Sequence, residues 1–402
     1  MEILLLFAFI AFIYFVTKKG RNDTIGSTTA SREAPIMGPF QIRTIKEKLD
    51  DNDKGDAPEV IRIEGKGLMP VSTKSKIAFV TSVLDNTDGT AKPVLSLVEQ
   101  FQEEHTTCYQ QIVEAGVAGP NEGYNSWVRV GVIIPDILLP PVGGNRKLKV
   151  ALRVINLDNP PKISMGVGGK GHAGVHGIYV KNFEWHFDGK GYQEEAADTD
   201  EARGLAVKLA MSIAMADGSL DDKEGKTIQN WIEKIITPFS DARQEKLKEL
   251  YNTALRESYE EAKAGGLSLS QITDHLNEIS DTPQKFEAME LCFDVMAADG
   301  VADESELDTI KSIAQALELD FDEIEKMRDQ RLIELNVSTE KQASIETIIG
   351  IESNWENDQI KKHLRDEYAK WNNRLNTLSE GQERDNAQHM LDVIAKARQK
   401  YA

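Results

Sequence analysis

The spacing of apolar residues divides the chain into three parts. Residues 3–16 form an unbroken apolar run, ILLLFAFIAFIYFV. Between about residues 57 and 192, short stretches alternate apolar and polar positions, which is the period of half-buried β-strands. From about Asp198 the apolar period becomes that of amphipathic helices. The pattern predicts a multidomain α+β protein with a membrane segment, a β-rich domain and a helical remainder.

The apolar run predicts an uncleaved transmembrane anchor over residues 1–19. Glu2 precedes the run and Lys18 and Lys19 follow it, whereas a signal peptide has basic residues first and a small-residue cleavage site afterwards. The basic flank predicts a body on the cytoplasmic side of a bacterial inner membrane. A cleaved signal or a peripheral segment are the alternatives. Residues 20–56 predict a linker with a short helix near residues 42–49.

Four alternating stretches predict strands in the domain at residues 57–192. They are residues 60–64, 127–133, 147–155 and 178–180. Turn signals such as Asp88-Gly89 separate them, which favours an antiparallel sandwich or barrel. This succession of strands and turns is similar to that of C2-like or immunoglobulin-like sandwiches, but it does not determine the topology.

Two features of this domain resemble chemical sites. GVGGKG at residues 166–171 fits a dinucleotide fingerprint, but the sequence continues into a predicted strand instead of a helix, so we interpret it as a loop. His172, His176 and His186 form the histidine cluster of the sequence, in a stretch too rich in glycine to be a helix. A metal site there is the minor alternative. No nucleophile–base arrangement stands out, so we expect a protein that is not an enzyme.

The helical part contains a duplication at an offset of 82 residues. In each copy an apolar helix runs into an Asp-Gly loop and a second helix follows. The first copy has apolar positions at Leu205, Leu209 and Ile213, then at Ile228, Trp231, Ile232 and Ile235. The second copy has them at Phe286, Met289, Phe293 and Met296, then at Ile310, Ile313, Ala314 and Leu317.

The loops read MADGSLDDKE (residues 215–224) and AADGVADESE (residues 297–306). In each, a glycine suits the left-handed end of a helix, and an Asp with a Glu three residues later forms a capping box for the next helix. These residues are Gly218 and Gly300, Asp221 and Asp303, and Glu224 and Glu306. A calcium loop of the EF-hand type is excluded because its twelfth position, where a Glu ligand is needed, would be Ile228 or Ile310.

Both loops resemble those of the TerB (tellurite resistance B) family, a small all-α fold built as a helical duplication. The resemblance covers about residues 196–336, within a predicted domain at 194–340, and treats residues 238–281 as an insertion. It implies that the two loops meet and hold a divalent cation, Ca²⁺ or Mg²⁺. The implied ligands are Asp217, Asp221, Glu224, Asp299, Asp303 and Glu306. Capping with solvation explains the same residues, and both interpretations stay open.

Residues 341–402 resemble a degenerate J-domain. The stretch SIETIIGI at residues 344–351 and IKKHL at residues 360–364 carry the likeness. J-domains stimulate Hsp70 through a His-Pro-Asp tripeptide, and the equivalent stretch here, KWNNRLN at residues 370–376, lacks it. We therefore expect a helical hairpin used for contacts. Its second helix should pack Met390, Leu391, Ile394 and Ala395 on Ile360, Leu364 and Tyr368. Trp371 is either part of that core or an anchor for a partner.

Charge and cysteine content narrow the function. Residues 194–340 carry 35 acidic and 15 basic side chains, which is roughly the entire formal charge of −19. Such a surface repels phosphate backbones, so we expect no nucleic-acid partner. Cys108 and Cys292 lie far apart in sequence, which excludes a disulfide framework.

The order anchor, tether, domain, TerB-like and J-like domain is similar to that of membrane-anchored DjlA-type co-chaperones, from which this chain departs by an inserted β-domain and by the loss of the J-domain tripeptide. We expect a non-enzymatic scaffold on the cytoplasmic face of a bacterial membrane, self-assembling or bound to other membrane-associated proteins, in tellurite or envelope stress. A cation sensor acting through the paired loops and a divergent Hsp70 co-chaperone are the alternatives.

Overall fold

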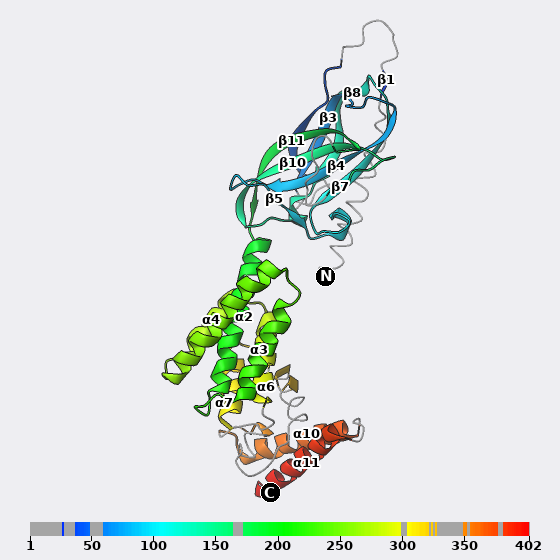
Figure 1. Ribbon diagram of the computed structural model, residues 1–402. Coiled ribbons are helices and arrows are strands. Elements are labelled where there is room, and N and C mark those ends of the chain that lie inside the picture. Colours follow the sequence, from blue (N-terminus) through cyan, green and yellow to red (C-terminus); the bar gives the residue numbers. More distant parts are fainter. Residues whose placement is uncertain are drawn as a thin grey trace. The chain divides into compact units, whose positions relative to one another are not determined.

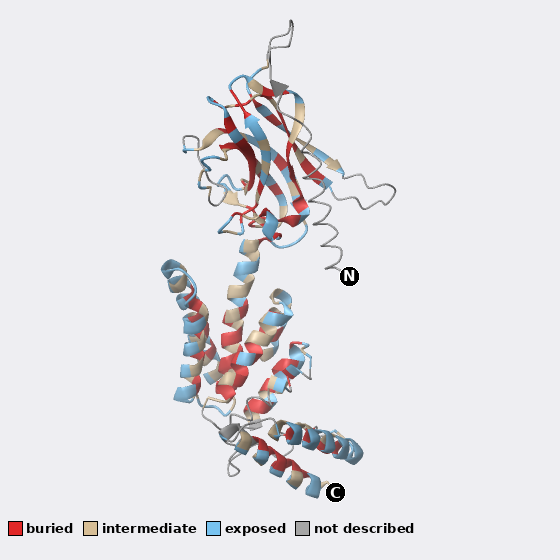
Figure 2. Cartoon of the chain, turned by 90° about the vertical axis from the view of Figure 1, so that its right-hand side faces the viewer, coloured by how far each residue is buried: buried red, intermediate tan, exposed pale blue. Residues whose placement is uncertain are grey.

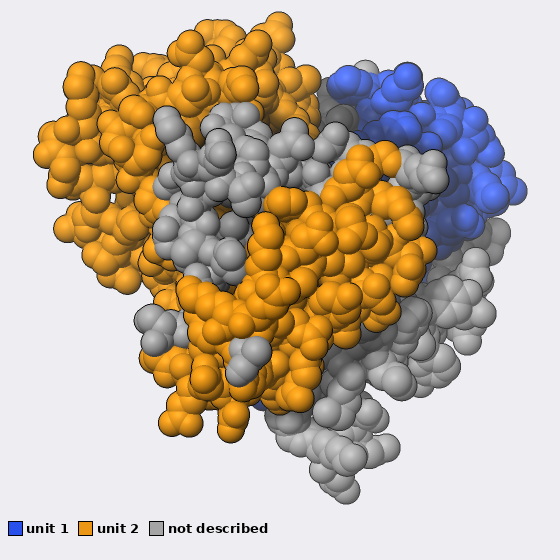
Figure 3. Space-filling view, turned by 90° about the horizontal axis from the view of Figure 1, so that it is seen from below, with its two compact units in different colours: residues 1–195 blue, residues 196–402 orange. Residues whose placement is uncertain are grey.

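The computed structural model describes residues 26–27, 37–48, 59–163, 172–298, 304–320, 323–324, 326–327, 349–351, 354–376 and 381–401. The chain divides into two compact units, residues 1–195 and residues 196–402 (Figure 3). Strands build the first unit and helices build the second (Figure 1). The predicted α+β fold, with a β-rich region followed by a helical region, is therefore confirmed.

The first sheet of the N-terminal unit has the strand order β1-β8-β3-β2. Its strands are β1 (Gly26–Ser27), β8 (Glu122–Ile133), β3 (Glu59–Leu68) and β2 (Gln41–Lys48). All three pairings are antiparallel, and Ile63 of β3 lies opposite Thr44 of β2 and Gly131 of β8. The strands predicted at residues 60–64 and 127–133 are thus neighbours.

The second sheet has the order β11-β10-β4-β5, and β7 also pairs with β4. Its strands are β11 (Val175–Phe187), β10 (Gly144–Asn156), β4 (Ser75–Asp85), β5 (Lys92–Pro93) and β7 (Gln110–Ala118). The short strands β6 (Leu95–Ser96) and β9 (Leu138–Leu139) pair with each other, and η2 (Glu99–Phe101) and η3 (Pro135–Ile137) are single 3₁₀ turns. The strands predicted at residues 147–155 and 178–180 are confirmed as parts of β10 and β11.

One hydrophobic core lies between the two sheets, which makes the unit an antiparallel β-sandwich. Phe79 of β4 stacks on Phe40 with ring centroids 5.9 Å apart and meets Tyr124 of β8 at 6.4 Å. Figure 2 shows buried and exposed residues following one another along the strands of this unit. Inward and outward residues alternate in parts of β2 and β11 and in the first half of β10, whereas β4 and the second half of β10 are buried at nearly every residue.

A buried ion pair joins β10 to the end of β4. Arg146 Nε lies 2.7 Å from Asp85 Oδ2, and the two side chains are 8% and 2% exposed. The second oxygen of Asp85 accepts hydrogen bonds from the backbone nitrogen of Thr87 at 2.8 Å and from its hydroxyl at 2.6 Å. Both oxygens of this buried carboxylate are thus satisfied.

The helix predicted near residues 42–49 is wrong. Residues 41–48 form β2, which pairs along its whole length with β3. Ile42 is 4% exposed and belongs to the sandwich core. The sandwich therefore includes a strand that the sequence pattern assigned to the linker.

The second unit is formed by eight helices in its described part. They are α2 (Tyr192–Ala214), which begins in the first unit, α3 (Asp222–Ile236), α4 (Asp241–Lys263), α5 (Leu269–Ile279), α6 (Thr282–Met296), α7 (Glu304–Ala316), α10 (Asn357–Leu375) and α11 (Gln382–Lys400). One continuous core unites them. The C-terminal half of α2 and most of α6 are buried, as expected for helices surrounded by others.

The two predicted helix pairs are α2 with α3 and α6 with α7. Leu209 and Ile213 of α2 and Met289 and Phe293 of α6 are buried in the core. Leu205, Trp231, Ile235 and Phe286 are partly buried and pack against it. The remaining repeat positions, Ile228, Ile232, Met296, Ile310, Ile313, Ala314 and Leu317, are buried. The apolar positions of both copies are confirmed.

Helices α10 and α11 form an antiparallel hairpin. Near one end Arg384 donates a hydrogen bond to the Leu375 carbonyl at 2.8 Å, and further along Arg398 lies 5.2 Å from the Tyr368 ring. The predicted apolar stripe is confirmed at Met390, Leu391, Ile394, Ile360 and Leu364, which are buried, and Ala395 is half-buried. Tyr368 differs from the prediction because it is 37% exposed.

Trp371 belongs to the core of this hairpin. It is 1% exposed, and its Nε1 donates a hydrogen bond to Glu367 Oε2 at 3.2 Å. Of the two roles that the sequence left open, the partner anchor is therefore wrong, because a side chain so fully enclosed presents no surface to another molecule.

Among the residues that the structure describes, no helix has both the length and the apolar character needed to cross a bilayer. The anchor predicted at residues 1–19 lies outside the described residues. So does GVGGKG at residues 166–171, and so do residues 344–348, which carry part of the J-like resemblance.

Candidate functional site

The first Asp-Gly loop connects α2 to α3 through a tight turn. Gly218 has a φ of +93°, in the left-handed region where L side chains are strained. Asp217 Oδ1 accepts hydrogen bonds from the backbone nitrogen of Ser219 at 2.8 Å and from its hydroxyl at 3.2 Å. The predicted glycine stop after α2 is confirmed, and Asp217 stabilises the turn that follows it.

Asp221 and Glu224 then start α3 with a capping box, as predicted. Asp221 Oδ1 accepts from the backbone nitrogen of Lys223 at 2.7 Å, and Glu224 Oε2 accepts from the backbone nitrogen of Asp221 at 2.8 Å. Glu224 is 7% exposed. Each predicted ligand of this loop therefore has at least one oxygen bound to a backbone amide.

The second Asp-Gly loop is described only from α7 onward. Asp299, Gly300 and Asp303 lie outside the described residues, and Glu306 is a buried residue of α7. Within the described ranges, no group of three or more His, Cys, Asp or Glu side chains is placed to hold a metal ion. The meeting of the two loops around a cation stays a prediction.

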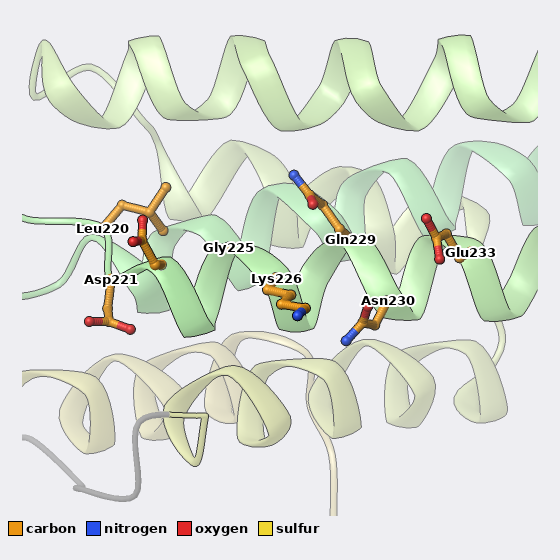
Figure 4. Close-up of a pocket in the computed structure, with 8 residues that line it drawn as sticks. Leu220, Asp221, Gly225, Lys226, Gln229, Asn230 and Glu233 are labelled. Carbon is orange, nitrogen blue, oxygen red and sulfur yellow. The ribbon is translucent and has the colours of Figure 1, made fainter.

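A groove with a volume of about 560 Å³ lies along α3 next to the first loop (Figure 4). We call it the acidic groove, and its lining is Leu220, Asp221, Asp222, Gly225, Lys226, Gln229, Asn230 and Glu233. Gly225 leaves room there because it has no side chain, and Leu220 packs 3.7 Å from where a Cβ would lie. Three carboxylates against one ammonium group give the groove a negative potential that suits cationic groups.

The sequence reasoning missed most of this groove. Asp222, Lys226 and Glu233 recur at helical spacing along the exposed side of α3, and Figure 4 shows Gln229 on one side of the helix and Asn230 on the other. That polar stripe is visible in the sequence. It could not be recognised there as a groove, because solvent-facing helix surfaces have the same pattern.

The three candidate histidines do not form one site. His176 lies near the start of β11 and His186 near its end. Ten residues of extended strand separate them by about 33 Å. His186 Nδ1 lies 2.8 Å from Asn145 Oδ1 and its Nε2 lies 3.3 Å from Asp188, while burial lowers the pKa of His176. His172 precedes β11, which begins as a strand at Val175 as predicted.

Both thiols are buried and free. Burial raises the pKa of Cys292 to about 12. Burial also raises the pKa of Cys108, with a smaller contribution in the same direction from the charge of Glu103. At neutral pH both are therefore protonated, whereas a nucleophilic cysteine needs to be a thiolate.

One segment of the helical unit is similar to a known protein family. Residues 240–329 match the family model of the tellurite resistance protein TerB. The match runs from the start of α4 to beyond α7 and contains the second Asp-Gly loop. This segment of the chain is thus TerB-like, as the resemblance of the loops predicted.

The TerB match is shorter than the predicted resemblance over residues 196–336. It leaves out α2, α3 and the first Asp-Gly loop. It includes α4 and α5, which the sequence reasoning treated as an insertion between the two copies. No curated protein and no solved structure matches the chain.

Proposed function

We propose that this chain is a non-enzymatic, self-assembling scaffold, anchored on the cytoplasmic face of a bacterial membrane and acting in resistance to tellurite or in envelope stress. The observation that carries the proposal is the TerB match at residues 240–329, in a helical unit joined on the same chain to a β-sandwich. TerB is a tellurite resistance protein by name, which supports the link to that stress.

The membrane anchor is supported by the sequence. The apolar run at residues 3–16 and the lysines behind it favour a segment that stays in the bilayer with the remainder of the chain inside the cell. Alkaline extraction of bacterial membranes containing the full chain tests this part. The anchored chain stays in the membrane pellet, and complete release into the supernatant would argue against an anchor.

The scaffold role is tested by the mass of the native particle. The full chain, extracted in mild detergent, is expected to migrate as a defined assembly with copies of itself or with other membrane-associated proteins. Mass spectrometry of the purified particle identifies the companions. A strain that lacks the chain should also lose viability on tellurite or under envelope stress, and equal growth in both conditions would contradict the stress role.

A second candidate function, a divalent-cation sensor, is motivated by the resemblance of both Asp-Gly loops to those of the TerB family. Asp217, Asp221 and Glu224 of the described first loop are not by themselves placed to hold a metal ion, so a sensor would need ligands from the second loop as well. Calorimetry of the full chain with Ca²⁺ and Mg²⁺ measures whether the carboxylates bind a cation or only cap the turn and the helix. Equal heats for the native chain and for the double variant Asp217→Asn/Asp221→Asn would eliminate the sensor.

The terminal hairpin supports a J-like contact module. Its two antiparallel helices share a core around Trp371, and His363 Nε2 lies 2.9 Å from the Ile349 carbonyl, which ties the segment before α10 to the hairpin. Because residues 370–376 lack the His-Pro-Asp tripeptide, we propose contacts without chaperone stimulation. Measured Hsp70 ATPase activity should not rise when the full chain is added, and a clear rise would favour the co-chaperone.

A further inference from the structure

The α10–α11 hairpin presents a basic face to solvent. Lys361, Arg365 and Tyr368 follow one another along one side of α10, and Arg398 of α11 lies over the Tyr368 ring at 5.2 Å. All four residues are exposed. We call these four residues the basic face.

Neither Arg365 nor Arg398 forms an ion pair with another residue in the described part of the chain. Their guanidinium groups are therefore available to carboxylates of another molecule. A planar guanidinium binds a carboxylate through two parallel hydrogen bonds, and an aromatic ring beside it adds apolar contact area. These are the side chains that most often dominate the energy of protein interfaces.

The acidic groove on α3 is complementary to this face in charge and in length. Asp222 and Glu233 are exposed at its two ends, and neither has an ion pair among the residues described. They are separated by about 16 Å along the helix axis, and the basic face extends about 10 Å along α10. A volume of about 560 Å³ leaves room for an aromatic ring between the two carboxylates.

We propose that the basic face of one copy of this chain docks into the acidic groove of a second copy. Tyr368 would enter the groove over Gly225, and Arg365 and Arg398 would meet the carboxylates of Asp222 and Glu233. The inference rests on the proposed scaffold function, since it names the surfaces through which the scaffold assembles.

This contact joins two different surfaces, so each copy has one face and one groove to offer to its neighbours. Repetition of the contact closes into a dimer or a ring where the rotation between copies closes, and grows as an open chain where it does not. Because the attraction is between exposed charges, salt should weaken it, as the Debye length falls from about 10 Å at 0.1 M to about 3 Å at 1 M ionic strength.

Two variants of the full chain in mild detergent test the docking. The face variant is Arg365→Glu/Arg398→Glu, and the groove variant is Asp222→Lys/Glu233→Lys. The control is Lys246→Glu/Lys248→Glu, which reverses two exposed charges on α4 outside both surfaces. If circular dichroism shows that a charge reversal disturbs folding, a neutral variant replaces it. The neutral variants are Arg365→Gln/Arg398→Gln for the face and Asp222→Asn/Glu233→Gln for the groove.

Mass photometry at low salt should show assemblies of two or more copies for the native chain and for the control. Each variant alone should lose at least ten-fold of its assembled fraction. An equal mixture of the face and groove variants should form dimers and nothing larger, because each variant keeps the surface that the other lacks.

Each other result has a defined meaning. If the native chain assembles and both variants assemble equally well, or if the mixture forms no dimer, the docking is refuted and the scaffold function stands. If the native chain is monomeric, the docking is refuted, and if no other protein co-purifies with it either, the scaffold function is refuted as well. Loss of binding to vesicles of anionic lipid by the face variant, with assembly unchanged, would assign the basic face to a membrane surface instead.

Discussion

The most informative perturbation of the first Asp-Gly loop is the substitution of Asp221. Its Oδ1 accepts the hydrogen bond from the backbone nitrogen of Lys223 at 2.7 Å, and Asp221→Ala removes this acceptor from the first turn of α3. Loss of an N-cap of this kind costs about 1 kcal/mol. The bond from the Asp221 backbone nitrogen to Glu224 at 2.8 Å does not involve the deleted side chain, so it remains.

A loss of about 1 kcal/mol should lower the melting temperature of a unit of this size by about 2 to 4 °C. Thermal unfolding followed by circular dichroism at the helical band measures it. Asp221→Asn is the matched control, because asparagine caps a helix about as well as aspartate and keeps the native stability within about 0.5 kcal/mol.

The two variants also separate the cap from a cation ligand. Asp221→Asn preserves the cap and removes the negative charge, so it should weaken Ca²⁺ binding only if the loop is a cation site. If Asp221→Ala melts with the native chain, or if Asp221→Asn is as unstable as Asp221→Ala, the assignment of this residue as an N-cap is refuted.

Further perturbations follow from the packing and the backbone conformation. Trp371→Ala should destabilise the terminal hairpin by about 3 to 5 kcal/mol in denaturant unfolding, and Trp371→Phe by clearly less. The native chain should lose stability between pH 9 and about 12, because the Cys292 thiol ionises at its usual pKa in the unfolded chain but stays protonated in the folded chain. The substitution Cys292→Ala should reduce this loss by up to about 1.4 kcal/mol per pH unit. Gly218→Ala should cost about 1 to 2 kcal/mol because of its positive φ, whereas Gly225→Ala, in a helix interior, should gain about 0.5 to 1 kcal/mol. Asp85→Ala should destabilise the sandwich by about 3 to 5 kcal/mol, because it leaves Arg146 buried and unpaired. A loss of stability smaller than that caused by an Asp→Ala substitution at an exposed position would contradict the ion pair.

Local patterns predicted most elements of the fold because each long strand and helix has a clear period. The failure at β2 has a physical cause. Ile42, Ile45 and Leu49 are spaced like one face of a helix, and charged residues surround them. What makes the segment a strand is its antiparallel partner β3, which follows a charged stretch, and a pairing of this kind is not written in the local sequence.

One part of the candidate site could be predicted from local sequence, and another part could not. The capping box of Asp221 and Glu224 could be predicted because it depends on residues three apart in one loop. The acidic groove could not, because it depends on the missing side chain of Gly225 and on the position of Leu220. The exposure of Tyr368, on which the basic face depends, could likewise not be predicted, because its spacing matches the apolar stripe although the residue is 37% exposed.

The scaffold function is tested most directly by the mass of the full-length particle extracted from its own membrane in mild detergent. We predict a defined assembly of several copies, alone or with companions identified by mass spectrometry, that dissociates towards single copies as the salt concentration rises. A single copy of the chain, with no protein co-purifying at low salt, would contradict the account.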